Sequence, residues 1–248
     1  MYPRVIFMSW LPCIFAALCV GISKSGFPGV SVLTVALMAQ VFPPMESTGI
    51  LLPILIFGDL CAVFVFRKDV LWNQILRMLP PAVVGITLGF FIMKLIPSQH
   101  FGPVLGWLLL LVAFLQGIRM RYPNLANSVP HTRPFAWSMG IWAGIVTMIT
   151  NAAGPVIAVY LLALEIPKKT LVTTSAWFFL IINLIKLPFS WSLGLLQTPS
   201  ILLDLSLCPF VILGTVIGQY LLKIIPQKVF EKVLLFSASI AALKMVLS

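Results

Sequence analysis

Long runs of apolar residues, separated by short polar stretches, make up almost the whole chain. The runs lie at about 5–22, 28–42, 48–66, 73–96 and 101–119 in the first half, and at about 136–150, 154–165, 171–189, 201–222 and 230–247 in the second. A helix needs about 20 apolar residues to cross a bilayer, so the last three runs of each half predict full crossings. The first two runs of each half are shorter, and we expect them to form a hairpin of short or broken helices.

The composition places the chain in a lipid bilayer. Apolar residues make up 60% of it and charged residues 9%, whereas soluble domains carry about 25% charged residues. The net charge of +10 could indicate a nucleic-acid partner, but the cations lie in short loops, as on the cytoplasmic side of membrane proteins. We therefore expect an all-α integral membrane protein with no nucleic-acid partner.

The residues that usually build metal, disulfide or catalytic sites show no such pattern here. The four cysteines lie inside apolar runs without the spacing of a metal site or a disulfide framework. The two histidines, His100 and His131, fall at a span end and in a polar connector. We expect no enzyme activity, no metal and no cofactor.

A duplication relates the two halves. Residues 80–101 and 209–230 share seven identities at an offset of 129, among them Gly85 with Gly214 and Gly89 with Gly218. Further upstream the offset falls to 124 or 125. The predicted repeats are 1–120 and 136–248, joined by a connector at 121–135.

The distribution of cations tests the hairpin model. If each short pair enters and leaves on one side, eleven cations share a face and three lie on the other; if each pair crosses once, the split becomes eight to six. The eleven are Arg67, Lys68, Arg77, Arg119, Arg121, Arg133, Lys168, Lys169, Lys223, Lys228 and Lys232, and the three are Arg4, Lys94 and Lys244. The hairpin model satisfies the positive-inside rule better, and it places the connector in the cytoplasm and both termini in the periplasm. Three crossings per half invert the second repeat, an arrangement that recurs in secondary transporters.

Two polar breaks interrupt the short runs, "SKSGFPG" at 23–29 and "TNAAGP" at 150–155. Pro28 and Pro155 suit the first position of the helices that follow. Two helix N-termini inside the bilayer offer free N–H groups and positive dipole ends, which favour an anion. The candidate substrate-binding residues in the breaks are Ser23, Lys24, Ser25, Gly26, Phe27, Gly29, Thr150, Asn151, Gly154 and Pro155.

A few polar residues inside the spans add to this site. Lys24 at mid-depth costs about 2.5–3.5 kcal/mol on insertion scales, and Lys186 is a second cation and binding candidate; alternatively, Lys24 lies near a membrane surface and Lys186 snorkels. The pattern predicts that Asp59 is the one acidic residue well inside a span. It pairs with a lysine or carries a proton, or together with Asn183, its counterpart in the other half, it joins helices structurally. Further candidates for the cavity wall are Thr173, Thr174 and Trp177.

Three motifs together carry a family resemblance. The "SKSGFPG" break, "PILIFGDLCAVFVFRKDVLW" and "TNAAGPVIAVYLLAL" after a duplication resemble the TauE/SafE family of sulfite and organosulfonate permeases over nearly the whole chain. The resemblance implies a multi-pass bacterial inner-membrane transporter of small sulfur oxyanions, such as sulfite or sulfoacetate, usually an exporter. It points to the residues of the two breaks as the site.

These observations predict a secondary transporter that works by alternating access around a midplane site formed by the two breaks. Its expected partners are a small anionic substrate, sulfite or a sulfonate, and the lipid bilayer. A passive anion channel, a transporter of another small anion, and a membrane enzyme or assembly factor are the alternatives. Proton or sodium coupling and a homodimer stay open.

Overall fold

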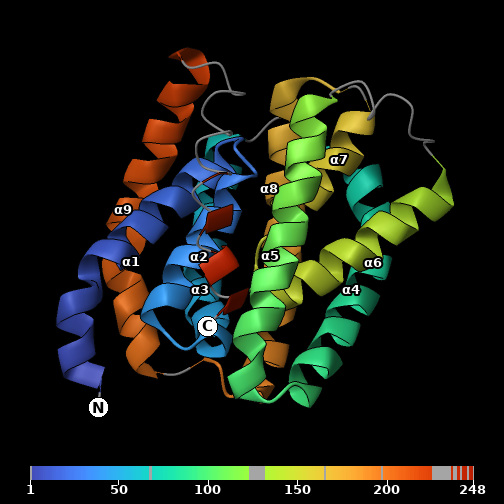
Figure 1. The fold of residues 1–248 in the computed structure, drawn as a ribbon. Helices are drawn as coiled ribbons and strands as arrows, with labels where there is room; N and C mark the ends of the chain where they lie inside the picture. The colour runs from blue at the N-terminus through green and yellow to red at the C-terminus, as the bar shows by residue number, and fades with distance from the viewer. Residues whose placement is uncertain are drawn as a thin grey trace.

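The computed structural model consists of helices and connecting loops, without strands, in the residues that it describes, which are 2–66, 69–122, 132–164, 166–196, 198–224 and isolated positions from 236 onward. Its helices are α1 (Tyr2–Lys24), α2 (Val30–Val41), α3 (Pro44–Val65), α4 (Trp72–Leu95), α5 (Ser98–Arg121), α6 (Arg133–Thr150), α7 (Gly154–Ala163), α8 (Lys168–Ser192) and α9 (Thr198–Ile224) (Figure 1). They match the predicted runs up to residue 224. The predicted run at 230–247 and several predicted loop cations lie largely outside the described residues.

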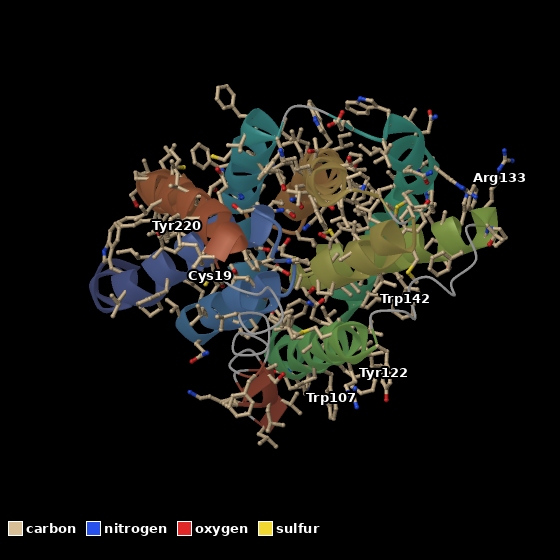
Figure 2. The ribbon with its side chains drawn as sticks, turned by 90° about the horizontal axis from the view of Figure 1, so that it is seen from above. Cys19, Trp107, Tyr122, Arg133, Trp142 and Tyr220 are labelled. Carbon is tan, nitrogen blue, oxygen red and sulfur yellow. The ribbon has the colours of Figure 1, made fainter. Side chains whose placement is uncertain are left out.

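Five of the described helices are long and apolar enough to cross a membrane. They are Pro44–Val65, Trp72–Leu95, Ser98–Ile118, Lys169–Ser192 and Leu202–Leu221. Large apolar side chains cover the outside of the bundle, and Trp107, Trp142 and Tyr220 lie at its periphery in the view from above (Figure 2). The chain is thus an all-α integral membrane protein, as predicted.

Helices α3 and α8 pack against each other in opposite directions. Gly49, near the start of α3, lies against Leu195, which follows α8. Beyond the other end of α3, the N–H of Leu71 donates to the hydroxyl of Thr174, near the start of α8 (3.2 Å). Since residue numbers rise along one helix as they fall along the other, the two are antiparallel.

Helices α1 and α9 are parallel neighbours from opposite halves of the chain. A Cβ on Gly214 would lie 2.2 Å from the carbonyl oxygen of Leu18, and one on Gly218 would lie 3.0 Å from the Cα of Ile22. The glycines let the two backbones approach closely, as small residues do between membrane helices.

Helices α4 and α6 repeat this arrangement. A Cβ on Gly144 would meet the carbonyl oxygen of Ala82 at 2.2 Å, and one on Gly89 would meet Met148 at 2.8 Å. The first helix of each half therefore packs along the fourth helix of the other half.

These directions fix the course of the short helices. Trp72 packs on Trp177 and Phe90 on Phe189, so α4 runs parallel to α8. Gly49 lies against Leu195, just before α9, and Gly58 lies against Val211 on α9, so α9 runs parallel to α3. Hence α1, α3 and α9 run one way, and α4, α6 and α8 the other. Since α1 and α3 run the same way, α2 has to return to the side where α1 begins, and α7 likewise returns to the side where α6 begins. Each short pair is a hairpin, as predicted, and corresponding helices of the two halves are inverted. The division into repeats at 120 and 136 stays a prediction.

Candidate functional site

The two breaks meet in the middle of the bundle. A Cβ on Gly154, at the start of α7, would lie 2.8 Å from the carbonyl oxygen of Pro28, so the two backbones are in contact. Gly26 turns the chain after α1 with φ 116°, a conformation that favours glycine. Asn151 ends α6 in the left-handed region with φ 58°, which asparagine tolerates.

The prolines sit slightly differently from the prediction. Pro155 is the second residue of α7. Pro28 lies two residues before α2 begins, in a turn where the N–H of Val30 donates to the carbonyl of Phe27 (3.0 Å). Pro28 therefore shapes the turn into α2 rather than its first helical position.

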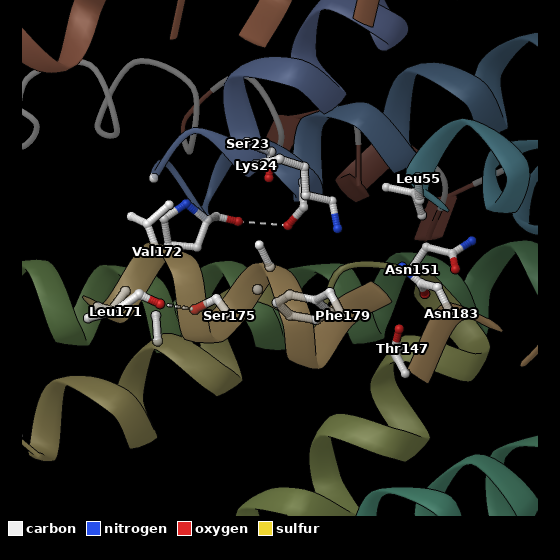
Figure 3. A pocket seen from close by; sticks show the side chains of 16 residues that line it. Ser23, Lys24, Leu55, Thr147, Asn151, Leu171, Val172, Ser175, Phe179 and Asn183 are labelled. Carbon is white, nitrogen blue, oxygen red and sulfur yellow. Dashed lines mark hydrogen bonds between the residues drawn. The ribbon is translucent and has the colours of Figure 1, made fainter. Parts of the chain in front are cut away.

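A small cavity of about 60 Å³ lies where the breaks meet (Figure 3). Polar and glycine residues supply one part of its wall, namely Ser23, Lys24, Gly26, Ser31, Thr147, Asn151, Gly154, Ser175 and Asn183. Apolar residues supply the rest, namely Pro28, Leu55, Ala158, Leu171, Val172, Ala176 and Phe179. Because Ser31 and Gly154 belong to the first turns of α2 and α7, the N-terminal ends of both short helices border the cavity.

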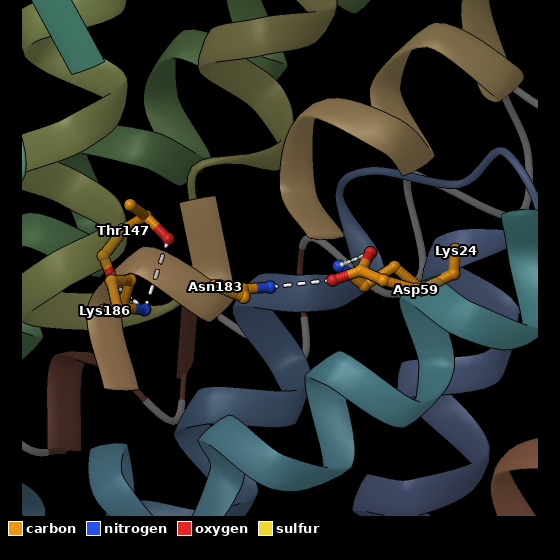
Figure 4. Close-up of polar contacts among 5 residues, drawn as sticks. All are labelled: Lys24, Asp59, Thr147, Asn183 and Lys186. Carbon is orange, nitrogen blue, oxygen red and sulfur yellow. Dashed lines mark hydrogen bonds and ion pairs between the residues drawn. The ribbon is translucent and has the colours of Figure 1, made fainter. Parts of the chain in front are cut away.

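One wall carries a chain of charged and polar contacts (Figure 4). The Nζ of Lys24 lies 2.6 Å from the carboxylate of Asp59, whose side chain is fully buried. The amide of Asn183 donates to the other carboxylate oxygen at 2.7 Å. The Lys24 ammonium also lies 4.6 Å from the centre of the Phe179 ring, a cation–π contact.

Lys186 lies behind the wall residues Thr147 and Asn151, and its hydrogen-bond partners among the described residues are neutral. Its ammonium donates to the carbonyl of Thr147 (2.7 Å), lies 3.4 Å from the hydroxyl of the same residue, and donates to the side-chain oxygen of Asn151. Asn151 in turn donates to the carbonyl of Thr48 on α3 (2.8 Å). Lys186 is only 1% exposed, so the alternative of a snorkelling lysine is wrong.

The charged pair lies well inside its span. Along α3, Asp59 is six residues from Val65 and fifteen from Pro44, which is about 9 and 22 Å at the helical rise. Lys24 is bound to it with a side chain that is 10% exposed. Lys24 is therefore enclosed within the bundle, and its depth in the bilayer stays a prediction.

Several predicted residues of the breaks lie next to the cavity without lining it. The hydroxyl of Ser25 lies within hydrogen-bond distance of the carbonyls of Gly21 and Thr215, and it holds the end of α1 to α9. Phe27 is fully buried in a separate apolar cluster, and Gly29 faces the side chain of Gln116.

In the second break, Thr150 and Pro155 also lie outside the wall. The hydroxyl of Thr150 donates to the carbonyl of Val146 (2.8 Å) and accepts from the N–H of Ala152 (3.0 Å). These bonds stabilise the turn between α6 and α7, so Thr150 acts through the shape of the break.

The three further candidates on α8 face other contacts. Thr173 donates to the carbonyl of Lys169, and Thr174 accepts from the N–H of Leu71. The ring of Trp177 packs on Trp72, with centroids 5.1 Å apart. Thr174 and Trp177 join α8 to the start of α4, Thr173 bonds within α8, and none of the three lines the cavity.

The sequence does hold a signal for the residues of α8 that were missed. Leu171, Ser175, Phe179 and Asn183 line the cavity at a spacing of four, and residues four apart share one face of a helix. Extending the face backward from Asn183 would have found them. Thr147, four residues before Asn151, follows the same rule on α6.

Asp59 is not the only buried acidic residue in a span. Asp204 on α9 lies within Leu202–Leu221 and is 4% exposed. Within the described part of the chain, neither of its carboxylate oxygens has a hydrogen-bond partner. The expectation of a single buried acidic residue is wrong. The run "ILLDLSLC" stays strongly apolar with one aspartate in it, so Asp204 lies inside the span.

A scan against protein-family models gives one functional assignment for this architecture. The model described as "Sulfite exporter TauE/SafE" matches residues 13–245. No curated protein and no solved structure matches the chain. The match covers nearly the whole chain, including both breaks and every residue of the cavity, and the family implies membrane transport of sulfite or related anions. The chain therefore belongs to the TauE/SafE sulfite exporter family.

Proposed function

We propose that the protein is a secondary transporter that exports a small sulfur oxyanion, sulfite or an organosulfonate, by alternating access around the cavity between the two breaks. The family supports transport of sulfite or related anions. The observation that carries the site assignment is the charge around the cavity: two lysines, the partly buried Lys24 and the buried Lys186, stand against one carboxylate, Asp59.

The donors around the cavity suit an oxyanion. The ammonium of Lys24 presents three N–H donors, and charge-assisted bonds from such a donor to an anion are stronger than neutral ones. The first N–H groups of α2 and α7 have no carbonyl partner within their helices, and no side chain caps α2. Their positive dipole ends favour negative charge at this end of each helix.

The size of the cavity restricts the ligand. A water molecule needs about 10–15 Å³ of cavity volume, so a cavity of about 60 Å³ has room for about four to six water molecules. That is the size of a small oxyanion such as sulfite. Larger sulfonates such as sulfoacetate need the wall to widen, which the apolar residues of α8 would have to allow.

The two hairpins suit alternating access. The α1–α2 pair enters from one side of the bundle and the α6–α7 pair from the other, and their inner ends border the same cavity. Movement of one hairpin opens the site toward one side, and movement of the other opens it toward the opposite side. The proposed orientation keeps both termini in the periplasm and the connector in the cytoplasm of a bacterial inner membrane. It is supported by Arg77 and Arg133, which line one groove at the proposed cytoplasmic end.

Transport in proteoliposomes tests the proposal. Purified protein is reconstituted, and uptake of radiolabelled sulfite is measured against an internal store of unlabelled sulfite. We expect the exchange rate to saturate with sulfite concentration. Lys24→Met and Lys186→Met should each reduce the rate by at least about tenfold, because each removes a buried cation or charge pair that contributes to binding. Lys94→Gln, at the exposed end of α4, is the control and keeps wild-type exchange.

Two results would contradict the proposal. Wild-type rates in both lysine variants would remove the site from the cavity. Flux that neither saturates nor responds to the internal store would favour a passive channel. Sulfate and short carboxylates in the same assay separate a sulfur specificity from a general anion specificity.

A further inference from the structure

The charges next to the cavity do not balance. Among the described residues that line the cavity or bind its wall, the ionisable groups are Lys24, Asp59 and Lys186. Lys24 is paired with Asp59 at 2.6 Å. Within the described part of the chain, the partners of Lys186 are the neutral oxygens of Thr147 and Asn151. With all three groups ionised, the site holds one excess positive charge.

An uncompensated charge at this depth is costly, so the occupied site should approach neutrality. A buried ion without a counter-ion costs several kcal/mol, and the cost in a membrane interior is of the same kind. One negative charge added to the cavity balances Lys186 while the Lys24–Asp59 pair stays intact. Two negative charges would leave the site with an excess negative charge.

A ligand and Asp59 also compete for the same cation. Lys24 lines the cavity, and its ammonium already touches the Asp59 carboxylate and the face of Phe179. An oxyanion that binds this ammonium therefore approaches the carboxylate. A proton on Asp59 removes that repulsion and frees Lys24 for the ligand.

Asn183 can satisfy Asp59 in both protonation states. Its amide NH₂ donates to the carboxylate at 2.7 Å, while its own oxygen, buried beside the cavity, has no hydrogen-bond partner among the described residues. A carboxyl group that gains a proton becomes a donor. After rotation of the Asn183 amide, its oxygen can accept that bond, so neither state of Asp59 is left without a partner.

We infer that the site accepts one net negative charge: a monoanion binds alone, and a dianion binds together with one proton, which resides on the Asp59 carboxylate. The inference rests on the proposed anion site and adds a rule for its ligands. The proton comes from solution and returns to it on release, and no bond of the ligand changes. The charged groups that face Asp59 in the described structure are Lys24 on α1 and Lys186 on α8, and Asn183 on α8 is its polar neighbour. The other helices packed against α3 add no charged group to this set.

Isothermal titration calorimetry with two probes of fixed charge tests this rule. Methanesulfonate is a monoanion and thiosulfate a dianion at neutral pH. Each is titrated into the purified protein in buffers with different protonation enthalpies, which reports the protons taken up on binding. We expect no proton uptake with methanesulfonate and about one proton per site with thiosulfate. Thiosulfate affinity should fall by about tenfold per unit of rising pH, while methanesulfonate affinity stays constant.

Variants identify the group that takes the proton. Asp59→Asn keeps a side chain that can bond Asn183 but carries no proton-accepting carboxylate. We expect thiosulfate to bind this variant without proton uptake and without dependence on pH. Asp69→Asn is the matched control, because Asp69 is exposed in the loop before α4 with φ 65°, which asparagine also adopts. It keeps the wild-type proton uptake.

The outcomes separate this inference from the proposed function. Thiosulfate binding without proton uptake in the wild type, or methanesulfonate binding with uptake, overturns the charge rule and leaves the anion site in place. Uptake that persists in Asp59→Asn assigns the proton to another group and overturns the role of Asp59. If Asp59→Asn does not fold, the two wild-type probes still decide the rule. Absence of binding by every anion overturns the proposed function itself.

Discussion

The amide of Asn183 donates to the carboxylate of Asp59 at 2.7 Å, and the two residues are 124 positions apart, which is the offset that aligns the two halves in this region. Equivalent positions of the two proposed repeats thus touch each other at the centre of the bundle. At this contact the halves differ in one atom type, a carboxylate oxygen in one and an amide nitrogen in the other. The difference leaves one carboxylate, instead of two, against two lysines.

Asn183→Asp should weaken anion binding. The substitution makes the central pair symmetric and adds a second carboxylate beside the first, so the charges of the site sum to zero without a ligand. We expect sulfite affinity to fall by at least about tenfold at neutral pH, with partial recovery at lower pH as one of the two carboxylates takes a proton. Calorimetry over a pH series measures this. Unchanged affinity would show that the charge of the central pair does not govern the site.

Gly154→Ala should separate the two breaks. The new Cβ would lie 2.8 Å from the carbonyl oxygen of Pro28, so one backbone has to move. Overpacking of this kind costs about 1–3 kcal/mol, and we expect a lower melting temperature together with weaker sulfite binding. Gly102→Ala is the control, since its Cβ would make an ordinary contact at 3.5 Å with Pro44. Equal behaviour of the two variants would contradict the close contact of the breaks.

Alanine at Gly85 or Gly214 should destabilise the bundle without acting on the site directly. Each Cβ would lie about 2 Å from a backbone carbonyl oxygen of the neighbouring helix, that of Ile141 or Leu18. Both variants should lose stability by similar amounts, because each residue spaces a first helix from a fourth helix in the same way. Thermal unfolding in detergent, followed by the fluorescence of the tryptophans, compares them. A large loss in one variant and none in the other would argue against the equivalence of the two interfaces.

Asp204→Leu should stabilise the protein. Both carboxylate oxygens lack hydrogen-bond partners in the described structure, and the side chain is 4% exposed. Removing a buried polar group that has no partner gains about 1–3 kcal/mol, so we expect a higher melting temperature. Transport assayed on the same preparation adds a second result. A stable Asp204→Leu protein that no longer transports would assign Asp204 a part in the transport cycle.

The sequence predicted the helices and their order well, because apolar runs bounded by polar residues report burial in lipid directly. The two breaks stood out for the same reason, since glycine, proline and lysine interrupt an apolar surround. The inversion followed from the number of crossings and the distribution of cations. Each of these features follows from neighbouring residues or from the number of crossings and cations, and none depends on which distant segments touch.

Contacts between distant segments were harder to predict. The sequence offered Asp59 either lysine as a partner, and only the fold places Lys24 on it and Lys186 on Asn151. Trp177 and Thr174 are polar or amphipathic residues inside the apolar run of α8, yet they face the start of α4 rather than the cavity. The face of α8 that borders the cavity depends on the rotation of the helix about its own axis in the bundle. The hydropathy of the run does not predict that rotation.

Because α1 packs along α9, the helices cannot assemble in the order in which they are synthesised. The ribosome makes α1 before any other helix described here, but the groove that receives its glycine face belongs to α9. Until α9 enters the bilayer, the surface of α1 around Leu18 and Gly21 lacks the helix against which it packs in the folded protein. The earliest helix is thus among the last to be locked in place, so a chain that stops before α9 should remain open to degradation in the membrane.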